Sequence, residues 1–148
     1  MLNKIKKDNK GFTIIEVLIV LAIAGLILLV VFLAVPALQR SSRNTQLKNG
    51  ASAVLAGVSE FVSNNDGKLP TEIEANDTGT VTISGTDGST QSTVKVKSGL
   101  TAGVNDNDQD INIQLKKKCP DTEDSRSYSA VIKLETGSGN TNNSCIDG

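Results

Sequence analysis

The chain has 148 residues, a formal net charge of −1 and 38% hydrophobic residues, with neither histidine nor tryptophan. The missing histidine excludes Ser-His-Asp and Cys-His catalytic centres and every metal or haem site that needs a histidine ligand. The near-zero net charge argues against a dedicated nucleic-acid-binding module, which is normally strongly basic.

A basic beginning is followed by a long apolar segment. Residues 1–11 carry four lysines and one aspartate, and residues 17–38 carry no charge. As a helix that rises about 1.5 Å per residue, the uncharged run spans roughly 33 Å, which is enough to cross roughly 30 Å of hydrocarbon. We therefore predict a transmembrane helix with a cytoplasmic amino terminus, because the lysines precede it. No secretory cleavage site follows the span, so we expect any cut to fall before it, at Gly11.

Glu16 is a carboxylate inside this apolar segment. A charge in a bilayer costs about 2.5–3.5 kcal/mol near the centre and less near the interface. One interpretation is a tolerated interfacial charge, and the other is a charge that waits for a cation. A cut after Gly11 would create such a cation at the α-amino group of Phe12, in the same chain or in a neighbouring one. A neighbour's amine would set the register of packed helices, the best-attested role of polar groups on apolar helices.

Residues 10–23, KGFTIIEVLIVLAI, resemble the class III signal of type IV prepilins, in which a basic leader ends in Gly before Phe and Glu follows at a fixed offset. The resemblance implies that a prepilin peptidase cuts after Gly11 and methylates the amine of Phe12. It also implies that Glu16 docks on the Phe12 amine of an adjacent subunit in a helical homopolymer. The implied partners are an assembly ATPase and an inner-membrane platform protein, besides membrane lipid before assembly. We predict no cofactor.

One detail departs from the family pattern. Family members often carry a proline closer to the mid-span glycine than Pro36 lies to Gly25. In related filaments such a Gly-to-Pro stretch loses helical structure, which implies a loosening between these two residues. The alternative is a kink in a continuous helix, caused by one missing hydrogen bond and a ring clash at Pro36.

The part of the chain after Pro36 has the pattern of a surface helix. Apolar residues recur three and four positions apart, at Leu47, Ala51, Val54, Leu55, Val58, Phe61 and Val62. We expect one helix from about Phe12 to Asn64, bent near Pro36 and ended by the sequence NNDG at 64–67. Its apolar stripe needs a sheet to cover it.

The remaining residues are rich in Thr, Ser, Gly, Asn and Asp, and apolar residues alternate with polar ones. The alternation predicts four short strands, at 80–83, 94–97, 111–115 and 128–134, with a hairpin loop at 84–92 that contains Asp87-Gly88. The fold class is α+β, a long helix packed against a small antiparallel sheet, as in type IV pilins. The expected segments are a leader at 1–11, a transmembrane and filament-core helix at 12–38, an amphipathic helix at 39–66 and a β-sheet head at 67–148.

Cys119 and Cys145 lie beyond the span, on the predicted outer side, where disulfides persist. Their even number favours a disulfide, which would contribute about 3.5 kcal/mol by the chain-entropy argument and enclose a flexible GSGNTNNS segment at 137–144. Free or metal-binding thiols are the alternative. A disulfide-bounded loop near the carboxyl end also resembles a region of many pilins that helps form the outer surface of the filament.

Two weaker signals lie between the predicted strands. Asp106, Asp108 and Asp110 alternate as oxygen ligands do in calcium loops, but Ile111 and Lys117 replace the glycine and glutamate of an EF-hand. We favour a solvated acidic turn over a calcium site. The run Lys116-Lys117-Lys118 is too short to indicate DNA binding, and a solvated strand end is the simpler interpretation.

Three functions remain open at this stage. The first is a structural subunit of an extracellular type IV pilus, inserted in the membrane as a prepilin, whose surface ligand the sequence does not identify. The second is a minor pilin or a pseudopilin of a type II secretion or DNA-uptake system. The third is a single-span membrane protein with an external enzyme or receptor domain, for which we find no nucleophile with a plausible base and no phosphate-binding loop.

Overall fold

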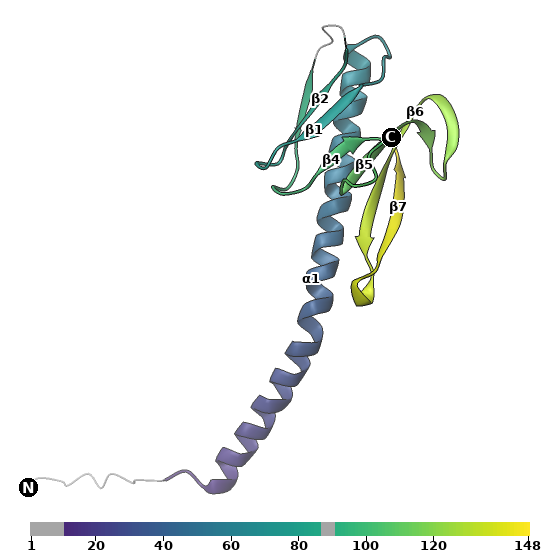
Figure 1. Cartoon of the computed structure of the whole chain (residues 1–148). Coiled ribbons are helices and arrows are strands. Elements are labelled where there is room, and N and C mark those ends of the chain that lie inside the picture. Colours follow the sequence, from purple (N-terminus) through teal and green to yellow (C-terminus); the bar gives the residue numbers. More distant parts are fainter. Residues whose placement is uncertain (1–10, 87–90) are drawn as a thin grey trace, which may run out of the picture. The chain divides into compact units, whose positions relative to one another are not determined.

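The computed structural model describes residues 11–86 and 91–148 (Figure 1). The predicted leader up to residue 10 and the Asp87-Gly88 pair of the predicted hairpin loop lie outside the described residues. The chain divides into two compact units, Met1–Gln39 and Arg40–Gly148, and helix α1 (Ile14–Asn64) contributes to both of them.

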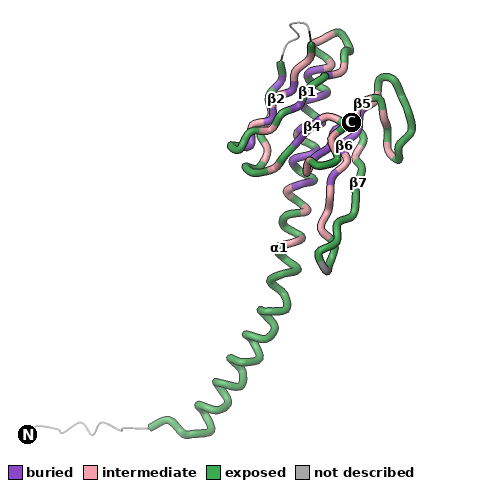
Figure 2. Tube along the Cα trace, viewed as in Figure 1, coloured by how far each residue is buried: buried purple, intermediate pink, exposed green. Residues whose placement is uncertain are grey.

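The described part of the first unit is an exposed apolar helix. Every large hydrophobic side chain from Phe12 to Leu38 is exposed, and Figure 2 shows this part of the tube as uniformly exposed. The most apolar 18-residue window of α1 has a mean hydropathy of 3.4, and none of it is buried. The helix is therefore long and apolar enough to cross a membrane, as the sequence predicts.

The second unit uses the last part of α1 as one wall of its core. The buried face of this helix contains Leu47, Ala51, Val54, Leu55, Val58 and Phe61, which confirms the predicted stripe. The helix ends where the sequence predicts: Gly67 has a φ of 80° and its N–H donates to the Val62 carbonyl at 2.9 Å. A left-handed glycine with this backbone hydrogen bond is a common way to satisfy the last carbonyls of a helix.

Two sheets pack in this unit. The first is antiparallel, in the order β1 (Glu72–Ala75), β2 (Thr80–Ser84) and β3 (Ser92–Lys95). The second has the order β4 (Ala102–Val104), β5 (Ile111–Lys118), β6 (Thr122–Glu135) and β7 (Thr141–Asp147), with β4 parallel to β5 and the other pairs antiparallel. A short 3-10 helix, η1 (Gly137–Gly139), lies between β6 and β7.

The α+β class is confirmed, but the single antiparallel sheet of the prediction is two sheets. The four predicted strands correspond to β2, β3, β5 and β6. The prediction missed the short strands β1 and β4, and it was wrong about residues 141–144, which belong to β7. β7 has a polar sequence because most of it is exposed, and its main chain pairs with β6 along its whole length.

The core joins both sheets to α1 through close contacts. The buried side chains include Phe61 from the helix, Ile83 from the first sheet, and Ile111, Ile113 and Ile132 from the second. Gly57 permits the approach of the first sheet: a Cβ atom there would lie 2.6 Å from Val94 Cγ1 and 2.7 Å from Ile83 Cδ1. A side chain at this position would push the sheet away from the helix.

Candidate functional site

Gly11, Phe12 and Thr13 form a short exposed segment before the first turn of α1. A Cβ atom added to Gly11 would meet nothing within 4 Å. The fold of the chain therefore gives no steric reason for a glycine at this position.

Thr13 and Glu16 form a capping box at the start of α1. The N–H of Thr13 donates to Glu16 Oε2 at 3.0 Å, its hydroxyl donates to the same oxygen at 2.8 Å, and the N–H of Glu16 donates to Thr13 Oγ1 at 3.4 Å. This reciprocal pattern satisfies N–H groups that the first turn of a helix otherwise leaves without acceptors. The carboxylate thus has a partner within the single chain, which the sequence reasoning missed although Thr-x-x-Glu is a recognisable signal.

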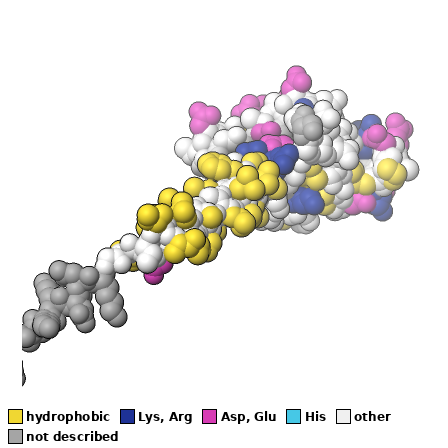
Figure 3. All heavy atoms as spheres, turned by 90° about the horizontal axis from the view of Figure 1, so that it is seen from below, with side chains coloured by type: hydrophobic (Ala, Val, Ile, Leu, Met, Phe, Trp, Pro, Cys, Tyr) yellow, Lys and Arg dark blue, Asp and Glu magenta, His cyan; other side chains and the backbone are white. Residues whose placement is uncertain are grey.

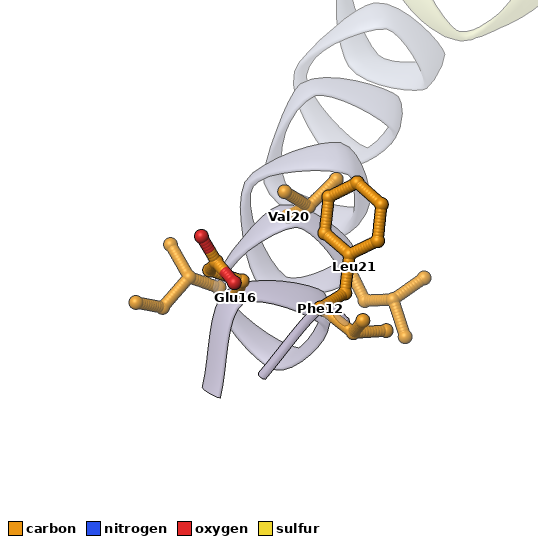
Figure 4. Close-up of a pocket in the computed structure, with 6 residues that line it drawn as sticks. Phe12, Glu16, Val20 and Leu21 are labelled. Atoms are coloured by element: carbon orange, nitrogen blue, oxygen red, sulfur yellow. The ribbon is translucent and has the colours of Figure 1, made fainter. Parts of the chain in front are cut away.

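The same turn presents an apolar hollow beside this carboxylate. The hollow has a volume of about 530 Å³ and is lined by Phe12, Glu16, Val17, Ile19, Val20 and Leu21. Figure 4 shows the Phe12 ring beside Val20 and Leu21, with the Glu16 carboxylate directed away from the ring. An open apolar wall next to one carboxylate suits the side of another apolar helix better than a small polar ligand.

The stretch between Gly25 and Pro36 is helical without interruption. Pro36 has no N–H, so it cannot donate to the carbonyl of Phe32, four residues earlier. No side chain of the stretch is buried. The loosening that the family resemblance implies stays a prediction for the assembled state.

The predicted disulfide between Cys119 and Cys145 is present, with the two Cα atoms 5.8 Å apart. Cys119 follows β5, and Cys145 lies in β7, the outermost strand of the second sheet. The N–H of Cys119 also donates to the Asp147 carboxylate at 2.6 Å. The disulfide and this hydrogen bond together fasten the turn between β5 and β6 to the edge strand β7.

The three aspartates of the calcium candidate take part in hydrogen bonds within the chain. Asp106 accepts hydrogen bonds from the Asp108 N–H at 2.9 Å and from Gln109 Nε2 at 3.0 Å, while Asp110 accepts from the N–H and the hydroxyl of Thr101. The hydrogen bond from the Asp108 N–H, followed by that from Gln109, lowers the pKa of Asp106. Among the residues that the structure describes, no three acidic, cysteine or histidine side chains gather as a metal site.

Arg43 and Glu135 connect α1 to the end of β6, a contact that the sequence did not predict. Arg43 Nε donates to Glu135 Oε1 at 2.8 Å and Nη2 donates to Oε2 at 2.6 Å. Beside this pair, the Asn44 side chain exchanges two hydrogen bonds with the main chain of Glu135, at 2.9 and 2.8 Å. The hydrogen bond to Glu135 raises the pKa of Arg43, and the hydrogen bond from Arg43 lowers the pKa of Glu135.

Comparison with known proteins identifies one segment. The family model of the prokaryotic N-terminal methylation motif matches residues 6–32. The match contains the Gly11-Phe12 junction, Glu16 and Gly25. Searches of curated proteins and of solved structures gave no match. The motif therefore identifies the amino-terminal segment, and the interpretation of the head depends on its own structure.

Removal of the disulfide should loosen β7. We expect the double variant Cys119→Ser/Cys145→Ser to lower the free energy of unfolding by about 3.5 kcal/mol, because the bridge constrains the unfolded chain. Urea unfolding of the detergent-solubilised chain measures the change, and faster hydrogen exchange in residues 141–147 would localise it. Dithiothreitol should lower the stability of the unsubstituted chain by the same amount as the double substitution and should leave the variant unchanged. Equal free energies of unfolding with and without the disulfide would contradict the prediction.

The Arg43–Glu135 pair should make the head sensitive to acid. The lowered pKa of Glu135 means that its contribution is present above the ordinary carboxyl pKa and is lost as the pH falls through the pKa of the folded state. We therefore expect Glu135→Gln to be less stable than the unsubstituted chain at pH 7, with a smaller difference at pH 3. Urea midpoints at the two pH values test this expectation. Asp121→Asn, which removes the exposed Lys117–Asp121 pair, is the control; an unchanged midpoint of Glu135→Gln at pH 7 would contradict the assignment.

Proposed function

Because the chain carries the class III signal peptide of type IV pilins, we propose that this type IV pilin-like or pseudopilin protein is a structural subunit of an extracellular type IV pilus. The observation that carries the proposal is that this signal leads into a helix whose large apolar side chains are all exposed as far as Leu38. Such a helix needs lipid before assembly and other helices afterwards. Figure 3 shows hydrophobic side chains along this helix and charged ones over the head.

The first step is processing of the membrane-anchored prepilin. The class III signal implies a prepilin peptidase and a pilus-type machinery. We place the cut after Gly11 and the methylation on the new amine of Phe12. The lysines of the leader keep this end in the cytoplasm until the cut, and the head lies on the outer side.

Glu16 guides docking in the second step. Its carboxylate can keep its hydrogen bonds to Thr13 and still accept another donor, because two carboxylate oxygens offer about four lone-pair positions. The amine of Phe12 in a neighbouring subunit is a positively charged donor, and it lies at the same end of that subunit's helix as Glu16 does here. Pairing cancels two charges that would otherwise remain in an apolar surrounding, so a helix in the correct register is favoured over one that has slipped.

Extraction from the membrane requires work from other proteins. Lipid and neighbouring helices are both apolar, so the transfer of the helix between them yields little hydrophobic free energy. A cytoplasmic assembly ATPase and a platform protein are the proposed sources of that work. The stretch from Gly25 to Pro36 is the proposed place where the helix loosens as the subunits pack.

The motif suits a minor pilin or a pseudopilin equally well, since these share the amino-terminal helix. The distinction lies in abundance and location. A filament preparation in which this chain is the dominant band favours the major pilin, whereas a trace component favours a minor pilin. A short assembly confined to the envelope would favour a pseudopilin.

Glu16→Gln should separate insertion from assembly. The amide keeps the size and one oxygen acceptor but cannot pair with a cationic amine, so we expect normal insertion and leader removal with at least a tenfold loss of polymerised protein. Quantification of sheared filaments against the membrane fraction measures this loss. Glu60→Gln, an exposed carboxylate of the head helix, is the control. Normal piliation of the Glu16→Gln variant would remove Glu16 from the mechanism.

Gly11→Leu should block processing without disturbing the fold, because a Cβ atom added to Gly11 would meet no described atom within 4 Å. We expect an intact leader in the membrane fraction and a Phe12 that is not methylated, as read by mass spectrometry of the amino terminus. Gly25→Leu also meets open space and should be processed normally. A mature amino terminus at Phe12 in the Gly11→Leu variant would show that the peptidase does not select this residue.

A further inference from the structure

The first sheet carries opposite charges on its two outer strands. Glu72 and Glu74 lie on β1, and Lys95 and Lys97 lie at and just after the end of β3. All four side chains are exposed. Within the described part of the chain no ion pair involves them: Glu72 accepts a long hydrogen bond from Ser84 and Lys97 donates to the neutral side chain of Gln46. These four charges are not neutralised inside one copy.

Each charged pair lines a hollow of a single sign. A polar hollow of about 540 Å³ lies where β1 and β4 meet, and its charged residues are Glu72, Glu74 and Asp106. A second hollow, of about 260 Å³, contains Lys95 and Lys97 beside Gln46, Asn49 and Gly50 of α1. No lysine or arginine is found among the described residues that line the first hollow, and no carboxylate among those that line the second.

The two pairs have the same spacing. Glu72 and Glu74 are two residues apart on the exposed face of β1, and Lys95 at the end of β3 is followed two residues later by Lys97, with a buried or half-buried residue between the members of each pair. Residues two apart in a strand are separated by about 6.8 Å. Two lysines at this spacing can therefore meet two glutamates of another strand at the same time, as opposite charges do across neighbouring strands.

We infer that Lys95 and Lys97 of one copy bind Glu72 and Glu74 of the next copy. The inference rests on the proposed function, since it names a contact between the heads of the filament. The contact is heterologous: each copy that donates lysines keeps its glutamates for a further copy, so the contact continues along an open assembly instead of closing into a dimer. Exposed ion pairs are individually weak and are screened by salt, so the contact is reversible and acts through repetition.

Charge reversal on one strand at a time tests the contact. Glu72→Lys/Glu74→Lys makes both strands basic, and Lys95→Glu/Lys97→Glu makes both acidic. Each full-length variant alone should lose at least fivefold in assembled filament at low salt, whereas coexpression of the two should restore filaments that contain both. Lys116→Glu/Lys118→Glu, two exposed lysines with the same spacing on β5, is the matched control and should assemble like the unsubstituted chain.

Cross-linking identifies the neighbour directly. Cells grown with light and heavy nitrogen supply the two forms, which are mixed in membranes or filaments and treated with a zero-length carbodiimide. We expect light–heavy peptides that join Lys95 or Lys97 to Glu72 or Glu74, and a loss of these peptides in high salt. Cross-links from the glutamates only to lysines of another protein would overturn the contact between copies.

The outcomes also separate this contact from the proposed function. If the unsubstituted chain forms filaments and both charge variants do so equally at low and high salt, the contact is wrong and the filament stands. If the variants fail both alone and together, the contact is likewise overturned. If the unsubstituted chain forms no filament, the proposed function fails, and the light–heavy cross-links in membranes then support the contact by their presence or overturn it by their absence.

Discussion

The apolar half of α1 is exposed throughout the part of the chain that the structure describes, and this exposure is the constraint on which the function depends. Its large side chains are exposed from Phe12 to Leu38, so water is excluded as their permanent surrounding. Lipid and the side of another apolar helix both give these side chains an apolar surrounding. Because these two surroundings are nearly equivalent in free energy, the few polar groups on the helix and the surface of the head must decide which neighbour is chosen and in which register.

Glu16 is a carboxylate on the apolar half of the helix, and the capping box gives it hydrogen-bond donors within the chain. Its hydrogen bonds with Thr13 supply two donors to one carboxylate oxygen and an acceptor to the first turn of the helix, while the negative charge remains. The carboxylate is held in one position by two groups of Thr13, its N–H and its hydroxyl. A new amine at Phe12 would therefore meet an acceptor that is already oriented, at little cost in side-chain freedom.

The sequence predicted those features whose physical cause is local. The apolar run, the stripe from Leu47 to Phe61 and the stop after Asn64 each depend on spacing within one helix, and all three are confirmed. The motif around Glu16 was recognised, although its bond to Thr13 was not. The prediction failed where the structure depends on contacts between residues far apart in the sequence. The polar segment β7 is a strand because its main chain forms hydrogen bonds with β6, and Arg43 contacts Glu135 across 92 positions of sequence.

The charged side chains on the outer faces of β1 and β3 also affect how copies of the first sheet can pair with one another. Among the described strands, β1 and β3 each form ladder hydrogen bonds with β2 alone, although β1 also lies beside β4 of the second sheet. Open edges invite uncontrolled pairing, and charged side chains are a common way to prevent it. Like charges repel two copies of β1 or two copies of β3, while opposite charges attract β1 of one copy to β3 of another. The residues that suppress random edge pairing would thus also select a single head-to-tail contact, the kind that an open helical filament needs.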